Sequence, residues 1–205
     1  NAQFPGIALD GSDVYLCWQR FVDRHDSLMA SCRRGDEVVW EREISDGGEV
    51  LHPVILAHGG AIWYAWSEYA RENWRILARC YRDGQWGEVL TVASGEALFF
   101  PRLFTWQGRL HIIWTEQHKG SAAAVLCPLT EAGPGAAETV SVVGEAYRAG
   151  AAEGGDGNLY VADDGFDGKQ YKLFARARTA AGWSEEIVVS QGEDWASTPW
   201  IAAKP

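Results

Sequence analysis

A repeat of about 48 residues runs through the sequence and constrains its fold more than any other feature. A Gly-Glu pair marks the period at Gly48-Glu49, Gly95-Glu96, Gly144-Glu145 and Gly192-Glu193. Proline keeps the same step at Pro5, Pro53, Pro101 and Pro199, and a central tryptophan does so at Trp18, Trp66 and Trp114. A second tryptophan recurs at Trp40, Trp86 and Trp183. Because unrelated residue types share one step, we interpret the chain as consecutive copies of one structural unit.

Each copy contains four short runs of strand character. In the clearest copy, from Val50 to Glu96, they are Pro53–Ala57, Ala61–Ser67, Trp74–Tyr81 and Trp86–Val92. The runs are rich in aromatic and β-branched residues and are bounded by turn signals such as Asp83-Gly84. A repeated helical pair is the competing architecture, but the Gly, Trp and Thr content argues against it. We therefore predict an all-β fold: a β-propeller, or a propeller segment, of four-stranded antiparallel blades.

The repeat also predicts the blade boundaries. The blades cover about 1–49, 50–96, 97–145 and 146–193, and 194–205 matches the opening of the first copy as the innermost strand of another. The third copy has Gly133-Pro134-Gly135 instead of the usual turn, which predicts an irregular outer edge. The chain is then either a segment of a larger propeller or a small ring of four blades. Open sheet edges promote aggregation, so we expect further blades of the same polypeptide or a partner chain to cover them.

Composition excludes several classes of function. The net charge is −10 and the pI about 4.9, so no basic face is available for nucleic acid or for an anionic membrane. No apolar run approaches the roughly 20 residues that span a bilayer. The chain begins with Asn1 and shows no signal peptide, which suggests a processed or excised chain of unknown compartment.

The four cysteines are interpreted as small buried side chains. Cys32, Cys80 and Cys127 fall at what the repeat indicates is one position of the third strand, and Cys17 adjoins a central tryptophan. Equivalent positions of neighbouring blades lie too far apart for a disulfide. Unpaired cysteines favour a reducing compartment slightly.

Three segments carry a resemblance to a known family: Ile62–Glu68 (IWYAWSE), Ile76–Trp86 (ILARCYRDGQW) and Arg109–Glu116 (RLHIIWTE). They resemble propellers of the sialidase-like, BNR/Asp-box-repeat superfamily, and Asp83-Gly84-Gln85-Trp86 is similar to a shortened Asp-box turn. The resemblance implies a propeller that handles carbohydrate, as a sialidase, another glycan-cleaving enzyme or a binding module. The arginine triad, tyrosine nucleophile and acid that it implies for a sialidase do not map onto this chain.

Ligand-binding candidates come from the loops that lead into the first strand of each blade, at one end of a propeller. The residues chosen are His52, Phe99, Phe100, Arg102, Tyr147, Arg148 and Trp195. Aromatic rings stack on the C–H face of sugars, and arginines bind carboxylates through two hydrogen bonds. For the two arginines, the alternative is an ion pair at the surface or between blades.

Carboxylates supply the remaining candidates. Glu68 and Glu116 each follow a central tryptophan by two residues, and a pair of carboxylates can perform glycosidic acid–base chemistry. The alternative is a solvated strand end. Asp163, Asp164 and Asp167 form a weak Ca²⁺ candidate, because oxygen ligands on a tight loop suit that ion, but an Asp-Gly turn is the favoured interpretation. Otherwise we expect no metal and no cofactor, since histidines and cysteines lack ligand spacing.

Three hypotheses for function remain open. The first is a ligand-binding module, with carbohydrate favoured, that is not itself an enzyme and is part of a larger polypeptide. The second is a glycan-active hydrolase or lyase whose site is completed by other blades. The third is a protein-interaction scaffold, and fold alone does not choose among these.

Overall fold

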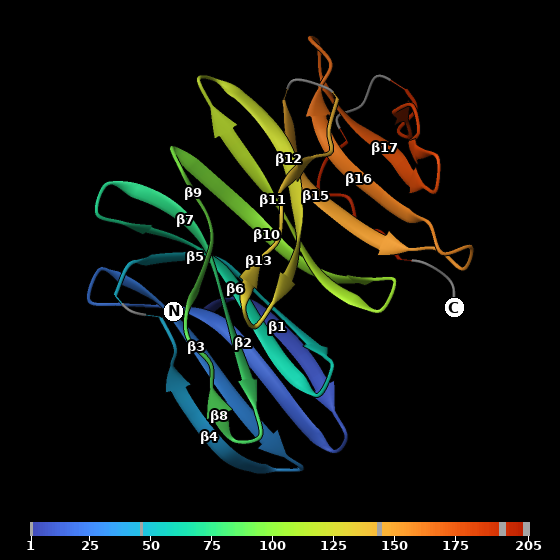
Figure 1. The fold of residues 1–205 in the computed structure, drawn as a ribbon. Helices are drawn as coiled ribbons and strands as arrows, with labels where there is room; N and C mark the ends of the chain where they lie inside the picture. The colour runs from blue at the N-terminus through green and yellow to red at the C-terminus, as the bar shows by residue number, and fades with distance from the viewer. Residues whose placement is uncertain (1, 46, 143–144, 193–195, 203–205) are drawn as a thin grey trace. The chain divides into compact units, whose positions relative to one another are not determined.

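The computed structural model describes residues 2–45, 47–142, 145–192 and 196–202, and these ranges contain strands and no helix (Figure 1). The strands form four antiparallel sheets, each ordered from first strand to last as the chain runs. This confirms the predicted β-propeller architecture of four-stranded blades. The chain divides into two compact units, Asn1–Leu103 with Glu131–Gly133, and Phe104–Thr130 with Pro134–Pro205.

The first unit contains two complete blades. The first blade consists of β1 (Ala2–Asp10), β2 (Asp13–Val22), β3 (His25–Arg34) and β4 (Glu37–Glu43). The second consists of β5 (Glu49–His58), β6 (Ala61–Ala70), β7 (Asn73–Arg82), and an outer strand in two pieces, β8 (Gln85–Trp86) and β9 (Leu90–Gly95).

The third and fourth blades repeat this order. The third has β10 (Ala97–Trp106), β11 (Arg109–His118), β12 (Ser121–Thr130), β13 (Gly133–Pro134) and β14 (Glu138–Thr139). The boundary between the units falls within β10, after Leu103. The fourth has β15 (Ala146–Glu153), β16 (Leu159–Phe166), β17 (Tyr171–Thr179), β18 (Gly182–Trp183) and β19 (Ile187–Val188).

The outer strand is irregular in every blade, not only in the third as predicted. In the first blade the β3–β4 register shifts between Cys32 and Arg33. In the second blade the outer strand is interrupted after Gly87, whose N–H donates to the Cys80 carbonyl across 2.9 Å. The outer strands of the third and fourth blades are interrupted at the equivalent point. Bulges of this kind are common at sheet edges, where they discourage pairing with another chain. The Gly-Pro-Gly of the third copy is therefore one version of a shared break.

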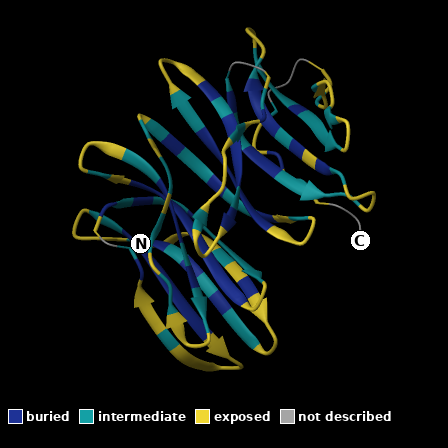
Figure 2. Ribbon diagram, viewed as in Figure 1, coloured by how far each residue is buried: buried dark blue, intermediate teal, exposed yellow. Residues whose placement is uncertain are grey.

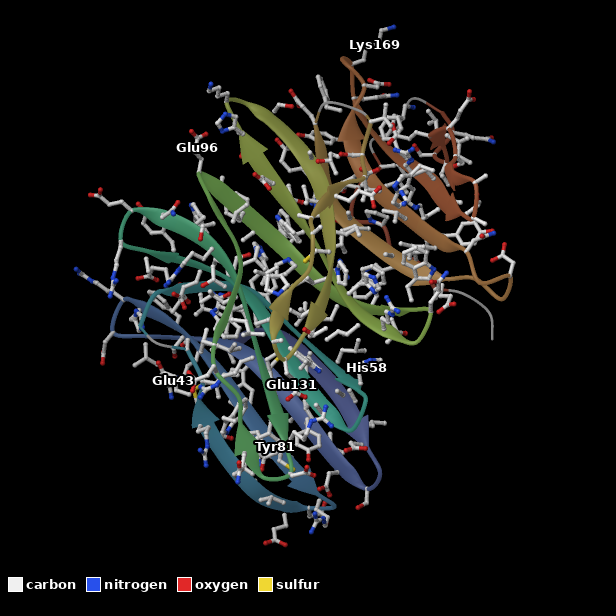
Figure 3. The ribbon with its side chains drawn as sticks, viewed as in Figure 1. Glu43, His58, Tyr81, Glu96, Glu131 and Lys169 are labelled. Atoms are coloured by element: carbon white, nitrogen blue, oxygen red, sulfur yellow. The ribbon has the colours of Figure 1, made fainter. Side chains whose placement is uncertain are left out.

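Aromatic rings fill the space between the first two blades. Tyr81 lies with its ring centroid 5.0 Å from both Trp40 and Trp86, and 6.2 Å from Tyr15 (Figure 3). Buried Trp66 belongs to the same core. Figure 2 shows the burial along the middle strands, β6 being buried along most of its length while β4 is largely exposed.

The second unit has a core of its own. Ile113 and Leu126 of the third blade pack with Leu159 and Val161 of the fourth, and Trp183 covers them from the outer strand. The first blade with the second, and the third with the fourth, thus bury apolar side chains between their two sheets, as blades of a propeller do.

All four cysteines are buried and free, which confirms their interpretation as small core side chains. Burial raises the pKa of the Cys17 thiol to about 12 and that of Cys127 to about 11, so both stay protonated. The assignment of Cys127 to the position of Cys32 and Cys80 is wrong. Pro128 occupies that register, and an offset of one residue places Cys127 on the opposite face of its sheet.

Among the described residues, no helix has the length and apolar character that crossing a membrane requires. Residues 196–202, the described part of the predicted fifth opening, form no regular strand. They nevertheless lie against the fourth blade, because the Ala196 N–H donates to the Tyr171 carbonyl across 3.1 Å.

Candidate functional site

The first strand of every blade carries an irregularity at the same repeat position. The β1–β2, β5–β6 and β15–β16 registers shift there, as a β-bulge does. The residues with positive φ at this position are Phe4 (51°), His52 (53°), Phe100 (55°), Arg148 (41°) and Thr198 (58°). We call these the bulge positions.

The prolines of the repeat accompany the bulge but are not required for it, since Arg148 has the same bulge before Ala149. Proline follows four of the five bulge positions, and alanine (Ala149) follows the remaining one. Proline has no N–H to donate to a ladder, and it pushes the preceding residue away from the right-handed helical conformation. A left-handed conformation costs a bulky L-residue about 1–2 kcal/mol, and such strain concentrates at binding sites. Three predicted ligand residues, His52, Phe100 and Arg148, thus have a left-handed backbone conformation.

A row of six rings crosses the first unit from these bulges. In order along the row they are Phe4, His52, Phe100, Phe99, Trp74 and Tyr69. Centroids of neighbouring rings are separated by 5.3, 4.2, 6.1, 4.6 and 5.3 Å. The rings come from β1, β5, β6, β7 and β10, so three successive blades contribute to one row. We call this set the ring row.

His52 stands inside the ring row between Phe4 and Phe100. Burial lowers the pKa of its imidazole to about 4, so the ring is neutral at physiological pH. Its Nδ1 is buried and has no hydrogen-bond partner among the described residues. A neutral imidazole has one donor and one acceptor nitrogen, and it therefore adds polar selectivity to an otherwise apolar row.

Exposure varies along the ring row. Phe4 is 47% exposed and Tyr69 40% exposed, while the four rings between them are half-buried. Partly exposed rings held by neighbouring rings offer a preordered apolar surface at little cost in side-chain entropy. Such a surface suits a ligand with apolar faces and polar edges.

A polar cavity of about 580 Å³ lies beside the tyrosine end of the row. It is lined by Gly48, Glu49, Glu68, Tyr69, Arg71 and Arg75, among others. Glu68 is 1% exposed, accepts a hydrogen bond from Trp66 Nε1 across 3.1 Å, and forms an ion pair with Arg75. Glu68 is therefore not a solvated strand end, and both carboxylate oxygens already have partners.

In the second unit the bulge residue Arg148 forms an ion pair. Its Nη2 lies 2.7 Å from Oδ2 of Asp164, which is fully buried, and Nη1 donates to Thr198 Oγ1 across 3.2 Å. Sequence reasoning left open an ion pair at the surface or between blades, whereas this one lies within the fourth blade, between β15 and β16, on a buried carboxylate. The ring centroid of Tyr147 lies 6.2 Å from that of Tyr171.

The three predicted calcium carboxylates do not converge. Asp163 and Asp164 are consecutive residues of β16 and so point to opposite faces. Asp164 binds Arg148, and Asp167 accepts the N–H groups of Lys169 and Gln170 in the following turn. Among the described residues, no group of three potential ligands could hold a metal ion.

The remaining candidates are placed separately. Arg102 is half-buried in the first unit, where burial lowers its pKa. Glu116 is half-buried and belongs to the second unit, so its pairing with Glu68 stays a prediction. Trp195 lies outside the described residues. Phe4 was missed, although it precedes Pro5 as His52 and Phe100 precede their prolines, and that shared context was a usable signal.

No model of a known protein family matches the chain, and no curated protein matches it in sequence. Solved structures do resemble it. The GH43B protein of a Bacteroides ovatus xyloglucan PUL matches with a TM-score of 0.58 and 13% identity over 94% of this chain and 41% of its own. An endo-arabinase of Bacteroides thetaiotaomicron matches with a TM-score of 0.60 and 12% identity, over 92% and 81%. A Bacillus subtilis arabinanase matches with a TM-score of 0.55 and 13% identity, over 95% and 84%.

These likenesses show the fold, which is that of a β-propeller. The chain spans 41% of the first of these structures and more than two thirds of the other two. At identities of 12 and 13% they do not identify an activity, which has to be argued from the side chains of this chain.

Proposed function

We propose that this chain is a carbohydrate-binding β-propeller module whose ligand lies along the ring row. The proposal is carried by one observation: the ring of His52 contacts the rings of both Phe4 and Phe100. These three residues occupy the bulge positions of three successive blades. Sugar rings present C–H faces to aromatic side chains and hydroxyl groups to polar neighbours, and the row supplies both. The solved structures of similar fold, named as an endo-arabinase and an arabinanase, support a glycan as the class of ligand.

Binding is favoured over hydrolysis by the state of Glu68. A carboxylate that acts as a general acid or base needs a free oxygen within reach of the substrate. The two oxygens of Glu68 face Trp66 Nε1 and Arg75, which instead gives it a structural role. The sialidase-like resemblance and a hydrolase or lyase completed by other blades remain the alternative proposal.

Calorimetric titration of the intact chain tests the proposal. The panel consists of arabinan, xyloglucan and sialylated oligosaccharides, so that it separates neutral from acidic sugars. We expect binding to one of them, and Phe100→Leu or His52→Ala to weaken it at least tenfold. Tyr160→Ala is the matched control, because Tyr160 is 39% exposed but belongs to the fourth blade.

The outcomes distinguish the three hypotheses. Binding that is insensitive to Phe100→Leu and His52→Ala, in variants with unchanged unfolding midpoints, places the ligand elsewhere and contradicts the proposal. No binding across the panel supports a protein-interaction scaffold. Release of reducing ends from the bound glycan supports the enzyme.

A further inference from the structure

The polar cavity at Tyr69 extends the ring row. Tyr69 is the last ring of the row and also lines the cavity, whose volume is about 580 Å³. That volume lies within the roughly 300–1,000 Å³ of small-molecule pockets. The described residues that line the cavity all belong to the first unit, as the ring row does. A ligand that lies on the ring row can therefore continue past Tyr69 into the cavity.

The two carboxylates that line the cavity are both engaged within the protein. Glu68 has the two partners described above, and the main chain covers it, because a Cβ atom on Gly48 would lie 2.7 Å from its Oε1. Glu49 Oε2 accepts the N–H of Asp26 across 3.3 Å, and Glu49 Oε1 lies 3.7 Å from Nδ1 of His25. The carboxylates are therefore held by partners of their own.

The two arginines that line the cavity differ in this respect. Arg75 is paired with Glu68. Arg71 is exposed, and it forms no ion pair or side-chain hydrogen bond with any residue that the structure describes. A guanidinium presents its N–H donors as a planar fork that matches the two oxygens of a carboxylate. Within the described chain, the cavity thus offers an unpaired cation to a ligand.

The hairpin between β6 and β7 fixes the position of this cation. Arg71 and Glu72 are its two connecting residues, with φ of 53° and 63°. Two-residue hairpins with positive φ at both positions normally contain glycine, as Lys119-Gly120 does in the third blade. A left-handed arginine persists only where the surrounding structure determines it, so Arg71 stands on a tight turn and not on a mobile loop.

We propose that the cavity holds the carboxylate of an acidic sugar, with Arg71 as its counter-ion, while a neighbouring sugar of the same glycan stacks on the ring row. The inference rests on the proposed function and narrows its ligand to an acidic glycan. With a net charge of −10, the chain as a whole repels such a glycan. A preference for the acid over its neutral form therefore has to come from a local cation.

Two ligands that differ in charge test the inference. They are a galacturonic acid trisaccharide and its methyl ester, each titrated by calorimetry into the intact chain. We expect the acid to bind at least tenfold more tightly than the ester, and Arg71→Gln to bring the two affinities within twofold of each other.

Arg24→Gln is the matched control and should keep the tenfold preference. Arg24 also belongs to a two-residue hairpin, with φ of 65°, and forms no ion pair with a described residue. It does not line the cavity. The control variant therefore removes the same charge from the same kind of turn. A preference for the acid that persists in Arg71→Gln, or that Arg24→Gln abolishes equally, overturns the inference.

The cavity is also probed apart from the ring row. Galacturonate and galactose are titrated as monosaccharides, and the ring resonances of Tyr69 are followed by NMR. We expect galacturonate alone to shift these resonances saturably, and Arg71→Gln to abolish the shift.

These outcomes separate the inference from the proposed function. Equal affinity for the acid and the ester, lowered in both by Phe100→Leu, keeps the ring row as a sugar site and overturns the acidic site. A saturable, Arg71-dependent shift of Tyr69 without binding of either trisaccharide supports the acidic site and contradicts the ring row. The absence of a saturable shift with galacturonate overturns the acidic site.

Discussion

The indole of Trp66 donates a hydrogen bond from Nε1 to Oε2 of Glu68, over 3.1 Å, and neither side chain reaches solvent. The other carboxylate oxygen binds Arg75, whose side chain is one-third exposed. In the third blade, Trp114 Nε1 is buried without a hydrogen-bond partner among the described residues, although Glu116 has the same spacing. In the second blade, one buried carboxylate therefore both satisfies the central indole and forms an ion pair.

Glu68→Ala is expected to destabilise the fold by about 3–5 kcal/mol, since it removes one partner of a buried ion pair and leaves Arg75 uncompensated. Glu43→Ala breaks the exposed ion pair between Arg20 and Glu43 and is expected to cost about 1 kcal/mol or less. Urea unfolding of both variants measures the difference. Equal losses would show that Glu68 acts as a surface residue.

Gly48→Ala is expected to disrupt the same ion pair from the main chain. A Cβ atom at Gly48 would lie 2.7 Å from Oε1 of Glu68, too close for the carboxylate to stay in place. Gly95 is the control, because it occupies the same repeat position but its nearest neighbour would be Leu98 Cδ2 at 3.6 Å. We expect Gly48→Ala to cost about 2–3 kcal/mol in urea unfolding and Gly95→Ala less than about 0.5 kcal/mol.

Most of the blade architecture could be predicted because it depends on local patterning. Markers such as Pro53 and Trp66 fixed the period, and turn signals such as Asp83-Gly84 separated the strands. What sequence could not supply is register. Cys127 is displaced from its apparent equivalents by one residue, and a displacement of one moves a strand side chain to the opposite face.

The candidate site was predicted only in part for a similar reason. His52, Phe99 and Phe100 were found from their place before the first strand of a blade, and the structure joins them in one row. Partnerships across blades, such as Trp74 with Phe99, depend on tertiary packing that no local pattern reports. Asp163, Asp164 and Asp167 cluster in sequence but point to different partners in space.

The stability of the chain should depend on pH through His52. Its pKa in the fold is about 4, below the 6.5 of a free imidazole, because burial disfavours the charged ring. The unfolded state therefore binds the extra proton, and the stabilisation present above pH 6.5 is lost as pH falls to about 4. We expect His52→Phe to reduce that loss by about 1–2 kcal/mol, allowing for partial solvent screening.

Thermal unfolding at several pH values between 7 and 4 measures this dependence. His118→Gln is the control, because His118 is exposed at the end of β11. A His52→Phe profile that runs parallel to that of the unmodified chain would show that the imidazole ring is not buried as described.

Asp163 should produce a pH dependence of the opposite sign. It stands at the position of the central tryptophan in the fourth blade, and burial, reinforced by Glu186 and Asp164, raises its pKa to about 7. The folded state thus retains a proton that the unfolded state releases above pH 3.8. The stabilisation is complete below pH 3.8 and is lost as pH rises through 7, with only partial compensation from Arg176.

Asp163→Asn imitates the protonated carboxyl and should remove that loss. We expect the variant to match the unmodified chain in urea unfolding at pH 4 and to exceed its stability by about 2 kcal/mol at pH 8. Asp167→Asn tests whether the gain in stability at pH 8 is specific to Asp163. The N–H groups of Gln170 and Lys169 lower the pKa of Asp167, so this variant should lose stability at pH 8 instead of gaining it. A gain for both variants would attribute the effect to net charge, whereas a gain for Asp163→Asn alone identifies a buried acid in place of the repeated tryptophan.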